Sequence, residues 1–180
     1  MKGPEMFDQA YDLTAETQNT LARGRFGHFI NGEVVFGSTG TFIDTISPAT
    51  GQVLASLSAG SAADVDLAVK AARQAFDGPW RGFSPYQRQE LLLDAVEVVR
   101  RNYRELAELE SLDMGSPISR TLGSEKAMVA RIRYFASLAL QINGETIPNG
   151  LPGEVLSYTR KSAAGVIGGI IPWNGPLVAQ

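Results

Sequence analysis

The sequence predicts an α/β fold built from helices and short strands. Residues 61–144 carry apolar side chains at helical spacing behind recognisable capping residues. Extended patterns flank this region at residues 25–57 and 145–161. Residues 165–171 form a short apolar run, Gly-Val-Ile-Gly-Gly-Ile-Ile, which is typical of a strand buried on both faces of a parallel sheet.

The first strands are predicted from turn chemistry. An alternating pattern over residues 25–35 is interrupted by Asn31-Gly32, which predicts a hairpin because both turn positions tolerate positive φ. Two further strands, at 41–46 and 52–57, are separated by a proline and a glycine that fix a turn. This region is structural in our interpretation.

Four helices are predicted next. Their boundaries come from the following patterns: Ser61 with Asp64, Ser84-Pro85 with Gln87, Asn102 with Glu105 leading to a stop at Gly115, and Ser124 to Asn143 closed by Gly144. Their apolar stripes are expected to face a core rather than a cofactor. Residues 145–161 then form an extended pair that should project as a hairpin and need a partner for its edges.

Composition limits the classes of function. The chain has 180 residues, 44% of them hydrophobic, and its 19 acidic and 16 basic residues give a formal charge of −3. This balance favours neither nucleic acid nor a membrane as a partner. The first residues resemble neither a signal peptide nor a transit peptide, so we expect a cytoplasmic protein. The absence of cysteine excludes disulfides, thiolate metal sites and a cysteine nucleophile within this chain.

Several motifs occur in a fixed order along the chain. They are Phe29-Ile30-Asn31-Gly32-Glu33, Ser47-Pro48-Ala49-Thr50-Gly51, Glu110-Ser111-Leu112-Asp113-Met114-Gly115, Gly144-Glu145-Thr146-Ile147-Pro148 and Ile170-Ile171-Pro172-Trp173-Asn174-Gly175-Pro176. Their order and spacing resemble the amino-terminal portion of the NAD(P)-dependent aldehyde dehydrogenase superfamily. The resemblance implies a truncated chain: the start of a Rossmann-like cofactor domain, with the catalytic domain absent. The complete enzyme would oxidise an aldehyde to a carboxylic acid with NAD or NADP.

The resemblance assigns roles within the last motif. Four residues correspond to positions that line the nicotinamide and ribose side of the cofactor site: Ile170, Ile171, Pro172 and Trp173. Asn174 corresponds to an asparagine whose carboxamide stabilises the oxyanion formed at a catalytic cysteine. From the residues alone, a turn asparagine after a core strand explains the same pattern. Gly175 replaces the phenylalanine usual in the family and adds backbone freedom beside the donor.

The resemblance also divides the chain. Residues 1–22, which are polar and weakly periodic, are expected to be a mobile N-terminal arm or a marginal helix. Residues 23–144 together with 162–180 would form part of the NAD(P)-binding domain. Residues 145–161 correspond to an oligomerisation hairpin that adds strands to a neighbouring subunit. We therefore expect a small aldehyde as substrate of the complete enzyme, and a homo-oligomer or a complementary fragment as the assembly.

Other catalytic constellations are poorly supported. His28 is the only histidine and is interpreted as a surface or packing residue. The acidic pairs, Asp64 with Asp66 and Glu108 with Glu110, are two residues apart, so they should point to different sides of a helix and be solvated. No cluster has the spacing of a metal site, and we predict no metal.

Two alternatives to an enzyme fragment that is inactive alone stay open. The chain could be a non-catalytic interaction or oligomerisation module, or a pseudo-enzyme remnant, that uses the hairpin at 145–161 to join a homologue. Alternatively, it could fold poorly by itself, because a strand at 165–171 without neighbours would present an aggregation-prone edge.

Overall fold

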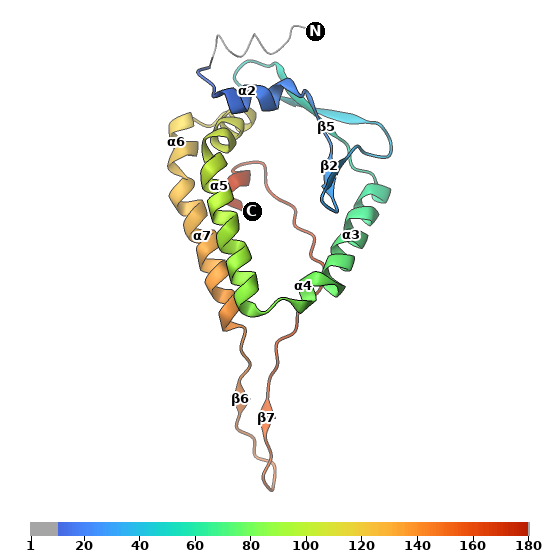
Figure 1. Cartoon of the computed structure of the whole chain (residues 1–180), viewed down its shortest axis with the longest axis vertical. Coiled ribbons are helices and arrows are strands. Elements are labelled where there is room, and N and C mark those ends of the chain that lie inside the picture. The colour runs from blue at the N-terminus through green and yellow to red at the C-terminus, as the bar shows by residue number, and fades with distance from the viewer. Residues whose placement is uncertain (1–10, 180) are drawn as a thin grey trace.

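The computed structural model describes residues 11–179, which form helices and short strands in two groups (Figure 1). One group is helical and consists of α5 (Pro85–Met114), α6 (Ile118–Gly123) and α7 (Glu125–Leu138), with α6 and α7 packed against α5. The other group contains the first five strands and α3 (Ala62–Asp77), and the short helix α4 (Pro79–Gly82) leads from it to α5. Helices mixed with short strands confirm the predicted α/β class.

The strands between residues 25 and 58 form two small sheets. In one, β2 (His28–Ile30) pairs antiparallel with β3 (Glu33–Val35). Asn31 and Gly32 join them with φ values of 55° and 83°, which confirms the predicted hairpin. In the other, β5 (Val53–Ser58) lies between β4 (Phe42–Ile46), to which it is antiparallel, and β1 (Arg25–Phe26), to which it is parallel.

Helix α2 (Ala15–Ala22) precedes these strands and is capped by the side chain of Thr14. Its hydroxyl groups contact α5, as described below. Of the two alternatives expected for residues 1–22, the structure has the helix at 15–22. Residues 1–10 lie outside the part of the chain that the structure describes.

The predicted capping boxes at Ser61 and Ser84 are both present, and Gly115 ends α5 with a left-handed φ of 73°. One predicted boundary is wrong. Asn102 with Glu105 does not start a helix, because α5 is continuous over 30 residues and the Asn102 side chain donates to the carbonyl of Val98 one turn earlier. A capping pattern without a break in the preceding periodicity does not begin a helix.

The helix predicted from Ser124 to Asn143 is shorter than expected. It ends at Leu138 and continues as a 3₁₀ turn, η1 (Ala139–Gln141). Gly144 has a different role from the predicted cap, because a Cβ atom there would collide with the carbonyl oxygen of Thr159. Glycine therefore permits the close approach of the two sides of the predicted hairpin, whose strands are β6 (Thr146–Ile147) and β7 (Ser157–Tyr158). This hairpin projects from the rest of the molecule (Figure 1).

Residues 165–171 do not form the predicted strand. Ile167 and Ile170 are 75% and 101% exposed rather than buried. A strand within a parallel sheet requires hydrogen-bonded neighbours, and none of the described strands pairs with this segment. The apolar pattern is typical of a buried strand, but the sheet that would bury it is not formed by the described residues.

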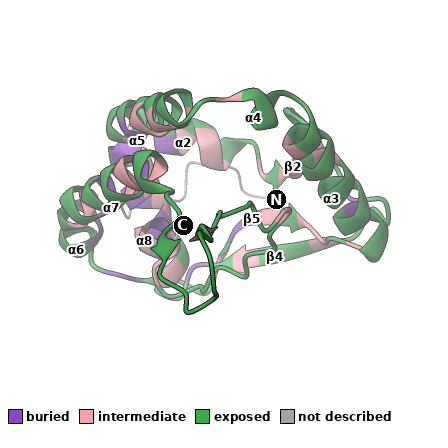
Figure 2. Cartoon of the chain, turned by 90° about the horizontal axis from the view of Figure 1, so that it is seen from below, coloured by how far each residue is buried: buried purple, intermediate pink, exposed green. Residues whose placement is uncertain are grey.

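The apolar core lies where α5 and α7 meet the last helix, α8 (Pro176–Ala179). Its buried cluster contains Tyr103, Ala107, Met128 and Leu177. By contrast, the predicted core face of α3 is uncovered, and Val65 is 59% exposed. Figure 2 shows buried residues gathered in the helical group and α3 largely exposed. Within residues 11–179, no helix has the length and apolar character that crossing a membrane demands.

Candidate functional site

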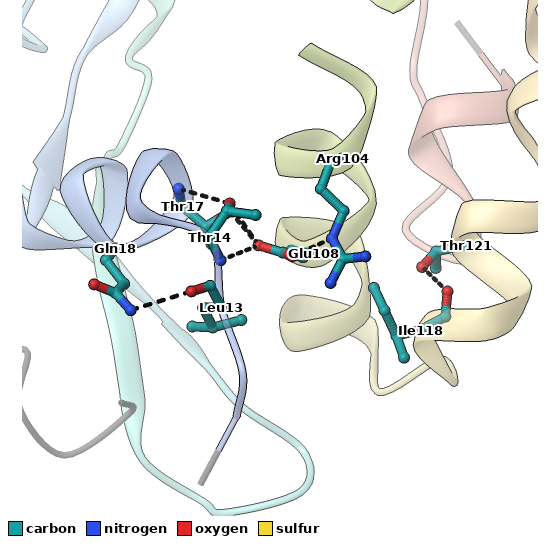
Figure 3. A network of polar contacts seen from close by, with 8 residues as sticks. All are labelled: Leu13, Thr14, Thr17, Gln18, Arg104, Glu108, Ile118 and Thr121. Atoms are coloured by element: carbon teal, nitrogen blue, oxygen red, sulfur yellow. Dashed lines mark hydrogen bonds and ion pairs between the residues drawn. The ribbon is translucent and has the colours of Figure 1, made fainter. Parts of the chain in front are cut away.

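Glu108 is the centre of a buried polar network between α2 and α5 (Figure 3). The side chain is 2% exposed. Its Oε2 accepts hydrogen bonds from Thr17 Oγ1 at 2.6 Å, Thr14 Oγ1 at 2.9 Å and Thr14 N at 3.0 Å, while Oε1 pairs with Arg104. Burial alone would raise the pKa of Glu108, but hydrogen bonds from Thr17, Arg104 and Thr14 outweigh it and hold the pKa below its usual value.

Asp64 is also buried, at 6% exposure, and fixes the start of α3. The Ser61 backbone N–H donates to it at 2.8 Å and the Ser38 backbone N–H at 3.0 Å. These hydrogen bonds, first from the Ser61 backbone and then from its hydroxyl, hold the pKa of Asp64 well below its usual value. The prediction of solvated acidic pairs is therefore wrong for Asp64, Glu108 and Glu110, although Glu108 and Glu110 do face different partners.

The His28 ring packs beside Gly37 and Gly60, within van der Waals distance of the place where a Cβ atom on either glycine would stand. Its Nε2 atom is buried and has no hydrogen-bond partner among the described residues. A ring packed in this way supports the interpretation of His28 as a packing residue rather than a general base.

A cavity of about 440 Å³ lies where α5, α6 and α7 meet the C-terminal segment. Its lining includes Glu110, Ser116, Arg120, Arg131, Pro172 and Asn174. The structure thus brings two of the five predicted site residues, Pro172 and Asn174, to one cavity. The other three, Ile170, Ile171 and Trp173, are outside its lining and are exposed by 101%, 45% and 80%.

Glu110 is the buried acid of this cavity, at 8% exposure. Burial raises its pKa, against the opposing effects of a hydrogen bond from the backbone N–H of Leu177 and the charge of Arg120. Sequence reasoning did not select Glu110 as a site residue. The available signal was its spacing, three residues after Ala107 and seven after Tyr103, which places it on the buried stripe of α5.

The backbone after Asn174 is held in an unusual conformation. Gly175 has a φ of 137°, a region that residues with a Cβ atom rarely adopt. Its carbonyl oxygen then accepts a hydrogen bond from Val178 N at 3.1 Å within the first turn of α8. Gly175 therefore defines the turn that carries Asn174.

The cavity offers a neutral carboxamide donor beside two arginines and a buried acid. The carboxamide and the two guanidinium groups can stabilise negative charge that develops on a bound molecule. The chain has no cysteine to supply a thiolate nucleophile. Among residues 11–179 there is also no group of three or more His, Asp or Glu side chains that could hold a metal ion.

Known proteins resemble this chain over most of its length. The family model described as "Aldehyde dehydrogenase family" matches residues 35–179. Aldehyde dehydrogenase family 2 member B4 of Arabidopsis thaliana is 44% identical over 151 residues, which are 83% of this chain and 28% of that protein. Aldehyde dehydrogenase 1 of Tanacetum cinerariifolium is 43% identical over 150 residues, covering 82% of this chain and 30% of its own length.

Solved structures agree with the sequence comparisons. The NAD⁺ complex of an aldehyde dehydrogenase from Bacillus cereus superposes with a TM-score of 0.87 at 39% identity, and the match covers 93% of this chain and 34% of that one. This chain therefore spans about a third of the length of the relatives that it matches.

Proposed function

The chain belongs to the aldehyde dehydrogenase family, and we propose that it forms the amino-terminal part of an enzyme that oxidises an aldehyde to a carboxylic acid with NAD or NADP. The observation that carries this proposal is the position of Asn174 on the wall of a cavity, at the turn into α8. The bound NAD⁺ of the Bacillus cereus relative supports the choice of a nicotinamide cofactor. A cytoplasmic location, expected from the composition, is part of this proposal.

Asn174 would act as the oxyanion donor. Its carboxamide can donate a hydrogen bond without changing charge, so it can stabilise the negative oxygen that forms when a nucleophile adds to an aldehyde carbonyl. One such donor contributes about 10²- to 10³-fold in rate. The nucleophile and the general base would come from outside these 180 residues, so the chain alone is expected not to turn over aldehyde.

The segment before Asn174 would supply one wall of the cofactor site. The exposed apolar side chains of Ile170 and Trp173 fit this role, because a flat aromatic ring can lie against an uncovered apolar edge. The bound cofactor would accept a hydride from the substrate. In this proposal residues 23–144 and 162–180 belong to the cofactor domain, and the remaining walls of the site come from elsewhere in the enzyme.

A chimera tests this function. Residues 1–180 would replace the matching third of the Bacillus cereus enzyme, and reduction of NAD⁺ and of NADP⁺ would be followed by absorbance with an aldehyde present. We expect turnover, and a kcat about 10²- to 10³-fold lower in Asn174→Ala. Asn102→Ala, at an exposed position of α5 outside the lining of the cavity, is the matched control and should keep its kcat. An Asn174→Ala chimera that folds and turns over as fast as the parent chimera would contradict the assignment.

A second candidate function is an interaction module, and the projecting hairpin is the observation that favours it. Leu151 and Leu156 are 62% and 73% exposed there, and the outer edges of β6 and β7 have no strand beside them among the described residues. Such edges pair readily with another chain, so we propose a homo-oligomer or a complementary fragment as the partner of residues 145–161. Leu156→Asp should lower the mass measured by light scattering while leaving the circular dichroism spectrum unchanged. An unchanged mass would show that this surface does not hold the assembly together.

A further inference from the structure

The turn that carries Asn174 is held in place by the residues that follow it. Asn174 itself is exposed. Three residues later, Leu177 is 8% exposed and belongs to the buried cluster with Tyr103, Ala107 and Met128. The orientation of Asn174 therefore depends on how the short segment between it and Leu177 is held.

Glu110 contacts this segment at two points. Its carboxylate accepts a hydrogen bond from the backbone N–H of Leu177. Its Oε1 atom also lies 4.0 Å from the place where a Cβ atom on Gly175 would stand, which is an ordinary van der Waals distance. A single buried side chain thus borders both ends of residues 175–177, and it lines the same cavity as Asn174.

The buried carboxylate of Glu110 has charged and polar side chains near it. Arg120 of α6 acts on it electrostatically, and Arg131 of α7 lines the same cavity. The pKa of Tyr103 is raised by burial and, to a smaller extent, by the charge of Glu110. Burying a carboxylate is unfavourable unless it is hydrogen-bonded or paired. An apolar residue at this position of the α5 stripe would avoid that cost but would leave the Leu177 N–H without its acceptor.

We propose that Glu110 is a positioning residue, which fixes the turn of Asn174 by accepting the Leu177 N–H and closing against Gly175. This inference rests on the proposed function, because the oxyanion role of Asn174 is what gives the turn its importance. The contact itself can be tested without any enzymatic activity.

The first experiment uses the 180-residue chain and follows amide hydrogen exchange by NMR. Glu110→Ala should increase exchange at Leu177 about tenfold or more, because a hydrogen bond to a charged acceptor is lost. Glu110→Gln keeps an acceptor oxygen and should retain most of the protection. Glu97→Ala, an exposed acid on the same helix, is the control and should leave Leu177 unchanged.

In the native chain the Leu177 amide shift should also follow a titration with a pKa above the usual range of glutamate, and Glu110→Gln should abolish it.

The second experiment uses the chimera. Glu110→Ala should lower kcat by about 10²-fold with an unchanged KM for NAD⁺, and Glu110→Gln should restore most of it, because small displacements of a catalytic group are costly. Unchanged exchange at Leu177 in Glu110→Ala, or an unchanged kcat, would overturn the proposal. A folded chimera that is inactive with native Glu110 would instead contradict the proposed function. Hydrogen exchange at Leu177 would still show whether Glu110 accepts the Leu177 N–H.

Discussion

The helical group of α5, α6 and α7 and the group around α3 are both rich in apolar residues, but the first buries more of them (Figure 2). Tyr103 and Ala107 are 3% and 0% exposed, whereas Val65 on α3 and Ile170 before α8 are 59% and 101% exposed. The difference shows that amphipathic patterning identifies a face that needs a partner, not a face that has one. Because the relatives are about three times as long as this chain, the partner surface for α3 and for residues 162–173 is to be sought in the rest of such an enzyme.

The largest contrast is expected from truncating one aromatic residue in the helical group and one in the exposed segment at residues 162–173. Tyr103→Ala should lower the free energy of unfolding by about 3–5 kcal/mol, because it empties a packed site and removes the hydrogen bond to Thr121 O at 2.8 Å. Trp173→Ala, in the exposed segment, should change it by less than about 0.5 kcal/mol. Urea unfolding followed by circular dichroism measures both. Equal losses would remove the distinction between the two regions.

The Glu108 network should give the next largest effect. Glu108→Ala leaves the hydroxyls of Thr14 and Thr17 without their acceptor in a buried site, which should cost about 3 kcal/mol of stability. Release of α2 should accompany it, seen as faster proteolysis near residue 22. Glu97→Ala, whose carboxylate is exposed, should cost less than about 0.5 kcal/mol. Loss of stability without release of α2 would show that the helix is held by other contacts.

Acid should weaken both regions through their buried carboxylates. The pKa values of Glu108 and Asp64 are lowered in the folded chain, so the stability they contribute is complete above their unfolded values, about 4.3 and 3.9, and is lost as the pH falls through the lower folded values. Urea midpoints measured from about pH 6 down to about pH 2 should therefore fall below about pH 4. Glu108→Gln and Asp64→Asn should each flatten the plot of urea midpoint against pH. Parallel plots for the native and variant chains would exclude the substituted carboxylate as a cause of the loss of stability in acid.

The smallest contrast comes from two glycines. Gly115 has a φ of 73°, and a Cβ atom there would lie 2.8 Å from Pro48 Cγ, so Gly115→Ala should cost about 1–2 kcal/mol. Gly168, in the exposed segment, has nothing within 4 Å of that position, and Gly168→Ala should change stability by less than about 0.5 kcal/mol. Thermal midpoints would separate the two, and a larger loss at Gly168 would reveal packing of that segment.

Local features were predictable from the sequence because their causes are local. The caps at Ser61 and Ser84 and the turn at Asn31-Gly32 depend on residues no more than three positions apart. The burial of Glu108 was not predictable in this way, because its partner Thr14 is 94 residues distant in sequence. The strand expected at 165–171 failed for the same reason, since pairing requires neighbours that no local pattern specifies.

The residues of the candidate site also differ in whether the sequence could predict them. Asn174 was identified through family resemblance, and its position on a cavity wall agrees with the proposed role without testing it. Glu110 was missed, because a charged residue on an apolar stripe is read as exposed unless its partner is known. Its acceptor role toward Leu177 becomes visible only when α8 packs against α5.

The glycine after Asn174 has a chemical consequence as well as a conformational one. A backbone nitrogen that belongs to glycine is poorly shielded, so it can attack the preceding carboxamide, expel ammonia and leave aspartate or isoaspartate after hydrolysis. At Asn174 this spontaneous ageing would exchange a neutral donor for an acid that repels an oxyanion. In the proposed enzyme, the Gly175 turn, at φ 137°, would therefore both position the Asn174 donor and expose it to deamidation.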